Sequence, residues 1–130
     1  MTDALKIALK ALDDKKAVDV VLLDISEIAS FARYFLLCSG ESSRQIQAIA
    51  EEVELRLKEN GVRANHIEGF SNAEWILMDY ADLVIHVFSR RARDYYDLER
   101  LWRDGRKMEV KRILSARATA APRGMARKRP

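Results

Sequence analysis

The sequence contains a single cysteine, Cys38, among its 130 residues. An intrachain disulfide is therefore impossible, which is typical of proteins that work in a reducing compartment. Cys38 lies in an apolar run with no histidine or asparagine nearby, so we expect a small core residue and not a nucleophile. No apolar run approaches the roughly 20 residues needed to cross a bilayer, and the N-terminal residues show no signal or transit peptide pattern. These absences predict a cytoplasmic protein with no membrane partner.

The common catalytic and metal-binding motifs are also missing. The two histidines, His66 and His86, are separated by twenty positions and form neither an HExxH motif nor a Cys/His spacing, so no zinc site is expected. Ser39 precedes a glycine, but no GxSxG motif surrounds it. His86 stands in an apolar run, where a histidine is most often neutral and hydrogen-bonded in a core or interface. The sequence predicts no catalytic residue, no metal and no cofactor.

Charge is distributed unevenly along the chain. The composition, with 48% hydrophobic and 33% charged residues, is that of one globular domain with a sizeable core. Residues 103–130 contain ten Lys/Arg and two Asp/Glu, a net charge of +8, whereas the first 102 residues have a net charge of −5. We therefore predict a mildly acidic folded domain at residues 1–104 and a basic, disordered tail at residues 105–130.

The pattern of apolar residues predicts an α/β fold. Helices are expected where apolar residues recur every three or four positions, and strands where short apolar runs lie between turn formers. The apolar runs at 75–78 and 83–88 predict an antiparallel hairpin in the middle of a sheet. The order α-β-β-α-β-β-β-α predicts a mixed sheet of about five strands flanked by helices. The expected elements are helix 3–16, strand 18–25, strand 33–39, helix 44–60, strand 62–68, strand 75–78, strand 83–88 and helix 90–103.

Two features keep an enzymatic alternative open. The junction after Ser39-Gly40 leads into a helix whose first N–H groups would attract an anion. It has one glycine and no Walker lysine, so ordinary helix capping is the preferred interpretation. Asp24, Asp79 and Asp82 are carboxylates that could converge on Mg²⁺. Asp79 and Asp82 flank a turn, where aspartate is favoured for local hydrogen bonds, so a turn role is the preferred interpretation. A small enzyme that uses Mg²⁺ and a nucleotide remains the alternative.

Aromatic residues gather in the second half of the chain, and acidic residues lie among them. Tyrosine and tryptophan are frequent at interface hot spots, and an acidic, aromatic surface favours a basic partner. Adjacent Tyr95 and Tyr96 are difficult to bury together with Trp102 at the end of a short helix. The aromatic residues are Trp75, Tyr80, Phe88, Tyr95, Tyr96 and Trp102, and the acidic ones are Glu68, Glu74, Asp79, Asp82, Asp97 and Glu99.

Three patterns follow one another in this part of the sequence, namely WxxxD at Trp75–Asp79, HVF at His86–Phe88 and YxLExLW at Tyr96–Trp102. In this order and spacing, and together with Ser39-Gly40 and Glu68-Gly69, the chain resembles the ribosomal silencing factor family (RsfS, also called Iojap). The match covers about residues 4–103. The resemblance implies a nucleotidyltransferase-like α/β fold that lacks the catalytic metal-binding acids of that fold.

The resemblance also implies a function and partners. A member of the family would be a homodimer that binds a protein of the large ribosomal subunit, the fourteenth in the usual numbering. It would block the joining of the two ribosomal subunits and repress translation when nutrients are short. The residues expected at the partner face, or supporting it, are Trp75, Asp79, Tyr96, Leu98, Glu99, Leu101 and Trp102.

The chain departs from the family pattern in two places. Arg33 stands where an acidic residue usually precedes the tyrosine, and the basic extension after residue 104 is not part of the family core. The extension suggests contacts with ribosomal RNA phosphates, which position a protein without specifying sequence. A tail that only adds solubility is an equally good interpretation. An RNA-binding module that works through its tail is thus a third functional alternative.

Overall fold

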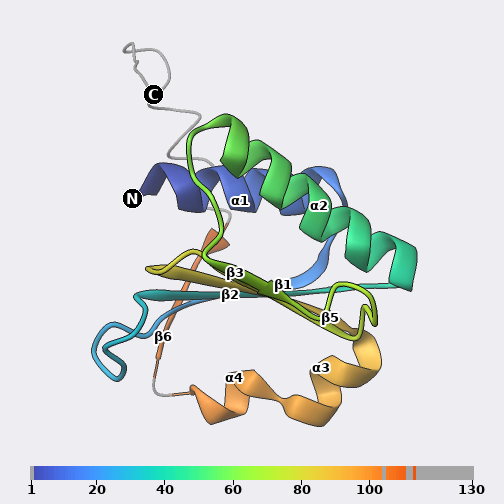
Figure 1. The fold of residues 1–130 in the computed structure, drawn as a ribbon. Helices are drawn as coiled ribbons and strands as arrows, with labels where there is room; N and C mark the ends of the chain where they lie inside the picture. Colours follow the sequence, from blue (N-terminus) through green and yellow to red (C-terminus); the bar gives the residue numbers. More distant parts are fainter. Residues whose placement is uncertain (1, 104, 111–112, 114–130) are drawn as a thin grey trace.

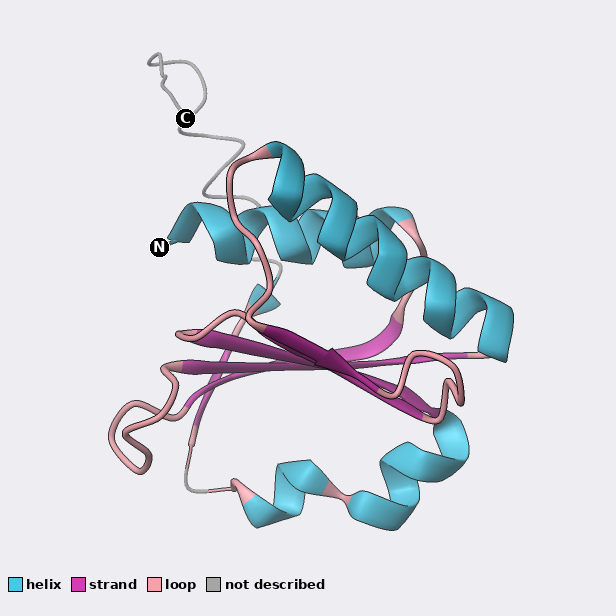
Figure 2. Cartoon of the chain, viewed as in Figure 1, coloured by secondary structure: helices cyan, strands magenta, loops and turns pink. Residues whose placement is uncertain are grey.

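The computed structural model describes residues 2–103, 105–110 and 113. It has three layers, in which a six-stranded mixed sheet separates α1 and α2 on one face from α3 and α4 on the other (Figures 1 and 2). The predicted α/β class is confirmed. Within the described residues, no helix is both long and apolar enough to cross a membrane. The elements are α1 (Thr2–Asp14), β1 (Val18–Asp24), β2 (Tyr34–Gly40), α2 (Ser43–Glu59), β3 (His66–Glu68), β4 (Trp75–Asp79), β5 (Leu83–Ser89), α3 (Arg90–Tyr96), α4 (Leu98–Leu101) and β6 (Arg106–Met108).

The strand order in the sheet is β3-β4-β5-β2-β1-β6. The two central strands, β2 and β5, run parallel, with Tyr34 opposite Leu83 and Gly40 opposite Ser89. A parallel pair needs a crossover connection, and α2 lies in that crossover. The β4–β5 hairpin is antiparallel, as the sequence predicts. Because β2 and β5 end at the same edge of the sheet, α2 and α3 both begin at that edge, on opposite faces (Figure 1).

Side chains of the strands alternate between two cores. The larger core lies under α1 and α2, where α2 buries the apolar stripe that includes Ile46 and Val53. Ser42 caps α2 by accepting a hydrogen bond from the Gln45 amide at 3.1 Å. Cys38 is fully buried in this core, and burial raises its thiol pKa to about 12, so the predicted packing role is confirmed. The smaller core lies under α3 and α4.

The predicted continuous helix at 90–103 is wrong. The helix stops at Tyr96, and Asp97 adopts the left-handed conformation with φ 47° and ψ 55° before α4 begins. Aspartate tolerates this conformation better than most residues, and the Asp97 amide still donates to the Arg93 carbonyl. The result is an elbow, centred on Asp97, that lets the chain follow the sheet face.

A sixth strand lies beyond the predicted domain boundary at residue 104. Arg106–Met108 pair antiparallel with the end of β1, at the outer edge of the sheet. Met108, Val110 and Ile113 then pack against the core under α1 and α2. The expectation of a tail from residue 105 onward therefore does not hold for this strand. The disorder predicted for residues 114–130 lies outside the described residues.

Gly69 sets the entry into the β4–β5 hairpin. Its φ of 84° is readily adopted only by glycine, and a Cβ atom at this position would collide with the Trp75 carbonyl oxygen. The Glu68-Gly69 pair therefore has a structural reason, which is to bring the backbone close to the start of β4. This close backbone approach fixes the position of Trp75, the first residue of β4.

Candidate functional site

A row of aromatic rings follows the sheet face that α3 and α4 cover. It starts on α3, where the ring centroids of Tyr95 and Tyr96 are 5.0 Å apart. Tyr96 then lies 4.6 Å from Trp75 of β4, and Trp75 lies 5.3 Å from Phe88 of β5. Offset and edge contacts at such distances stabilise aromatic pairs. The end of α3 is thereby fixed to the hairpin.

The row continues toward α4 through His86. The imidazole lies 6.0 Å from Trp75 on one side and 4.7 Å from Phe35 on the other. Phe35 packs at 5.2 Å against Trp102, which follows α4, and Trp102 packs at 5.8 Å against Phe31 of the β1–β2 loop. We call the whole set the aromatic row. Its members are Phe31, Phe35, Trp75, His86, Phe88, Tyr95, Tyr96 and Trp102.

The two ends of the aromatic row are exposed and its centre is buried. Tyr95 is 80% exposed, Tyr96 47% and Phe31 61%, while Trp75 and Trp102 are half-buried. A hollow of about 390 Å³ lies beside Tyr95 and Tyr96, with Glu74 and Arg91 among its other lining residues. Exposed aromatic rings fixed on a rigid base are the usual anchors of a protein–protein interface.

His86 is neutral at the centre of the row. Its Nδ1 atom accepts a hydrogen bond from the Trp75 indole at 3.1 Å, so the ring proton is on Nε2. The ring is 3% exposed, and burial lowers the pKa of His86 to about 4. Nε2 is buried without a hydrogen-bond partner among the described residues. The predicted neutral, hydrogen-bonded core histidine is confirmed.

Arg93 is a buried cation beneath the α3–α4 elbow. Its guanidinium donates to the Ser39 hydroxyl at 2.9 Å, the Asp19 carbonyl at 2.8 Å and the Glu99 carboxylate at 2.8 Å. The hydrogen bond from Arg93 lowers the pKa of Glu99, more than burial raises it. Sequence reasoning missed Arg93 because an arginine beside an apolar stripe is usually solvated. Its partners come from distant strands, and no local pattern signals them.

At the junction after Ser39-Gly40, where a phosphate could bind, Glu41 and Gln45 are engaged with other parts of the protein. Glu41 makes a bidentate ion pair with Arg90, at 3.0 and 2.9 Å. Gln45 accepts from the Glu41 amide and donates to the carbonyls of Lys15 and Lys16. The polar groups of this junction thus serve helix capping and connection, as the preferred interpretation holds.

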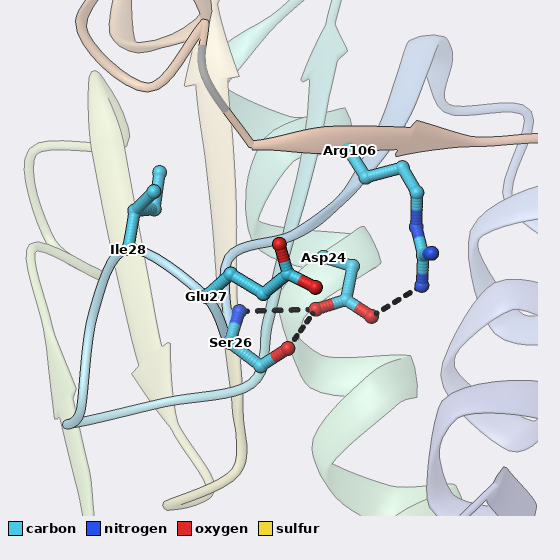
Figure 3. A pocket seen from close by; sticks show the side chains of 5 residues that line it. All are labelled: Asp24, Ser26, Glu27, Ile28 and Arg106. Carbon is cyan, nitrogen blue, oxygen red and sulfur yellow. Dashed lines mark hydrogen bonds and ion pairs between the residues drawn. The ribbon is translucent and has the colours of Figure 1, made fainter.

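Asp24 is also committed to internal contacts (Figure 3). Its carboxylate accepts from the Ser26 amide and hydroxyl, at 3.0 and 2.6 Å, and from Arg106 at 3.1 Å, beside a hollow of about 60 Å³. Burial opposes its ionisation, but these hydrogen bonds prevail and lower the pKa of Asp24. Arg33 adds an ion pair at 3.7 Å, so the departure from the family pattern at this position has a structural role.

The three aspartates do not form a metal site. Asp79 closes the hairpin turn by accepting from the Ala81 amide at 2.8 Å, which is the predicted turn role. Asp24 belongs to β1, which is separated from β4 by two strands. In the part of the chain that the structure describes, no group of three or more acidic, histidine or cysteine side chains is arranged to hold a metal ion.

The family model described as "Ribosomal silencing factor during starvation" matches residues 1–130. The chain belongs to the ribosomal silencing factor family. It is 49% identical over 100 residues to the ribosomal silencing factor RsfS of Bacillus subtilis, which covers 77% of this chain and 85% of that protein. The RsfS protein of Halalkalibacterium halodurans is 42% identical over 113 residues, covering 87% of this chain and 97% of that protein.

A solved structure has a similar fold. A crystal structure of a protein from Chromobacterium violaceum has a TM-score of 0.76 and 40% sequence identity, over 82% of this chain and 88% of that chain. The resemblance read from the sequence motifs is thus confirmed. Membership of the ribosomal silencing factor family supports a ribosome-associated role in translational silencing, and it points to a regulatory factor rather than an enzyme.

The residues that the family motif predicts for a partner face are only partly brought together. Trp75, Tyr96 and Trp102 lie in the aromatic row, whereas Asp79 is at the far end of β4 in the hairpin turn. Leu98, the first residue of α4, is buried, and Glu99 is bound to Arg93. Leu101 is the last residue of α4, and its side chain is not among those that the structure describes. The motif therefore combines surface rings with residues that support them.

Proposed function

We propose that this ribosomal silencing factor represses translation by binding a protein of the large ribosomal subunit and blocking association of the two subunits. The mechanism is steric occupancy without chemical turnover. The observation that supports it is the aromatic row, which provides exposed rings on a rigid, buried base at the α3–α4 face. The partner expected from the family resemblance is the fourteenth protein of the large subunit.

Shape and aromatic anchoring support the proposal more than net charge does. The sequence predicts an acidic, aromatic surface, but exposed arginines lie beside its acids. Arg91, whose side chain is 85% exposed, stands 3.6 Å from Glu74 in the hollow next to Tyr96. Charges of both signs at the rim would orient a partner, while the rings contribute most of the binding energy.

Binding to the isolated partner tests the proposal. We expect the purified chain to bind the isolated fourteenth ribosomal protein, and to bind whole large subunits at least as tightly, measured by interferometry and cosedimentation. The protein surface would supply the main contact in both cases, and the basic tail would add contacts with RNA only on the whole subunit. If large subunits bind the chain while the isolated protein does not, another component of the subunit is the partner.

The proposal includes three further properties that rest on the family. The free protein would be a homodimer, which sedimentation velocity measures directly. It would act in the cytoplasm, where the ribosomal subunits are, with no membrane partner.

The enzymatic alternative would gain support only if a nucleotide with Mg²⁺ raised the melting temperature, because a ligand that binds the native state stabilises it.

The basic tail is proposed to add contacts with ribosomal RNA phosphates. A chain that ends at Ile113 keeps β6 but loses the five cations Arg117, Arg123, Arg127, Lys128 and Arg129. We expect this shortened chain to bind large subunits with a weaker dependence on salt, because each phosphate contact contributes about one to the slope of log K against log salt. Cosedimentation between 50 and 200 mM salt, about the range in which such contacts weaken, measures it. Complete loss of binding would instead favour the tail-driven RNA-binding alternative.

A further inference from the structure

The ion pair between Arg93 and Glu99 joins two residues six positions apart. In a continuous α-helix, residues three or four apart share a face, whereas residues six apart point in different directions. The pair forms here because Asp97, in the left-handed conformation, ends α3 and turns the chain before α4. The 2.8 Å contact therefore bridges the elbow, and its length depends on the angle between the two helices.

The elbow separates the two parts of the aromatic row that α3 and α4 carry. Tyr96 is the last residue of α3 and packs on Trp75, while Trp102 follows α4 and packs on Phe35. A change in the elbow angle would move one ring relative to the other. The angle thus determines whether the Tyr96 and Trp102 rings can contact a single partner surface at the same time.

Arg93 is itself fixed to the sheet. It is 8% exposed and holds the Ser39 hydroxyl at the end of β2 and the Asp19 carbonyl of β1. Asp19 lies where the β1–β2 register shifts, with a φ of 52°. A guanidinium held by two strands is a rigid reference point, because its planar donors fix direction as well as distance. The ion pair with Arg93 therefore holds the Glu99 carboxylate at a defined position over the sheet.

We infer that the Arg93–Glu99 pair is a clamp that positions the aromatic row, and that Glu99 acts through Arg93 and not by contacting the partner. This inference rests on the proposed function of the α3–α4 face. It makes Glu99, which the sequence motif places at the partner face or in support of it, a positioning residue. Arg93 becomes a positioning residue for the same binding event.

A double-mutant cycle on binding tests the clamp. Arg93→Gln, Glu99→Gln and the double variant are compared for their dissociation constants with purified bacterial large ribosomal subunits. We expect each single variant to weaken binding about tenfold, and the double variant to be no weaker than the worse single one, because both changes open the same contact. Glu99→Gln should then have no effect in the Arg93→Gln background. Equal effects of Glu99→Gln in both backgrounds would show a direct contact and overturn the inference.

A matched pair controls for general destabilisation. Arg56 and Glu52 form a similar ion pair at 2.6 Å on α2, at the opposite face of the sheet. Arg56→Gln with Glu52→Gln should lower the melting temperature slightly and leave binding unchanged. If Arg93→Gln does not fold, Arg93→Lys takes its place in the cycle, since lysine keeps the charge but not the planar donors.

A second measurement separates failure of the clamp from failure of the proposed function. Proton NMR reports the contacts between Trp102 and Phe35 and between Tyr96 and Trp75 without any partner. The clamp predicts that Glu99→Gln weakens the Trp102–Phe35 contact and keeps the Tyr96–Trp75 contact. If the unmodified chain does not bind large subunits, the proposed function fails. If both ring contacts are unchanged in Glu99→Gln, the clamp fails, whatever the partner.

Discussion

Replacing Tyr96 and Trp102 together by alanine is expected to weaken binding to large ribosomal subunits by at least about 100-fold, the range of interface hot spots. These two rings lie at opposite parts of the aromatic row and are partly exposed. Each packs on a ring that is fixed in the sheet, at 4.6 Å for Tyr96 and 5.2 Å for Trp102. A ring that is already ordered loses little entropy when a partner covers it, so its truncation removes mainly binding energy.

The control for this loss lies on the other face of the molecule. Leu55 is 51% exposed and belongs to α2, which lies on the sheet face opposite α3 and α4 (Figure 1). Leu55→Ala should leave the dissociation constant unchanged in the same cosedimentation assay. Circular dichroism of the double variant should show a folded protein. If the folded double variant binds as well as the unmodified chain, the α3–α4 face is not the docking surface.

Acidification from pH 6.5 to pH 4 is expected to destabilise the protein by about 3 kcal/mol through His86 alone. The folded state holds the pKa of His86 at about 4, whereas an exposed histidine in the unfolded chain titrates near 6.5. Between pH 4 and pH 6.5, His86 is mostly protonated in the unfolded state and mostly neutral in the folded state. The contribution of His86 is therefore fully present above pH 6.5 and is lost as the pH falls toward 4.

Urea unfolding at a series of pH values measures this effect. His86→Leu should flatten the dependence of the unfolding free energy on pH between 6.5 and 4. Some stability at neutral pH will be lost, because the Trp75 indole then has no acceptor. An unchanged slope in His86→Leu would mean that burial does not keep this histidine neutral.

Much of the fold follows from local sequence patterns, and the exceptions have physical causes. The hairpin and the long helix α2 are predictable because apolar periodicity and turn residues agree along those segments. The elbow at Asp97 is not, since the apolar spacing from Tyr95 to Trp102 continues through it. Strand β6 carries little strand signal in its own residues. Its ladder with β1 and the Arg106–Asp24 pair, both long-range, hold it in place.

The residues of the candidate site also fall into two groups, those that local sequence patterns identify and those that only the fold brings together. Trp75, Tyr96 and Trp102 are identifiable because they stand in a spaced family motif. Phe31 and Phe35 complete the row from a segment some seventy residues before Trp102 in sequence, where only the fold brings them near. Arg93 is similar, because its buried partners on β1 and β2 are distant in sequence. The family motif identifies the surface rings, whereas the residues that hold these rings in place are distant in sequence and come together only in the folded protein.

The most direct test of the proposed function is the joining of purified ribosomal subunits, followed by light scattering, with increasing amounts of the chain. We expect the rate and extent of joining to fall in proportion to the fraction of large subunits that carry the protein. The variant with Tyr96→Ala and Trp102→Ala should leave joining unaffected at the same concentrations. If large subunits saturated with the unmodified chain join small subunits normally, steric blockade is not how this protein works.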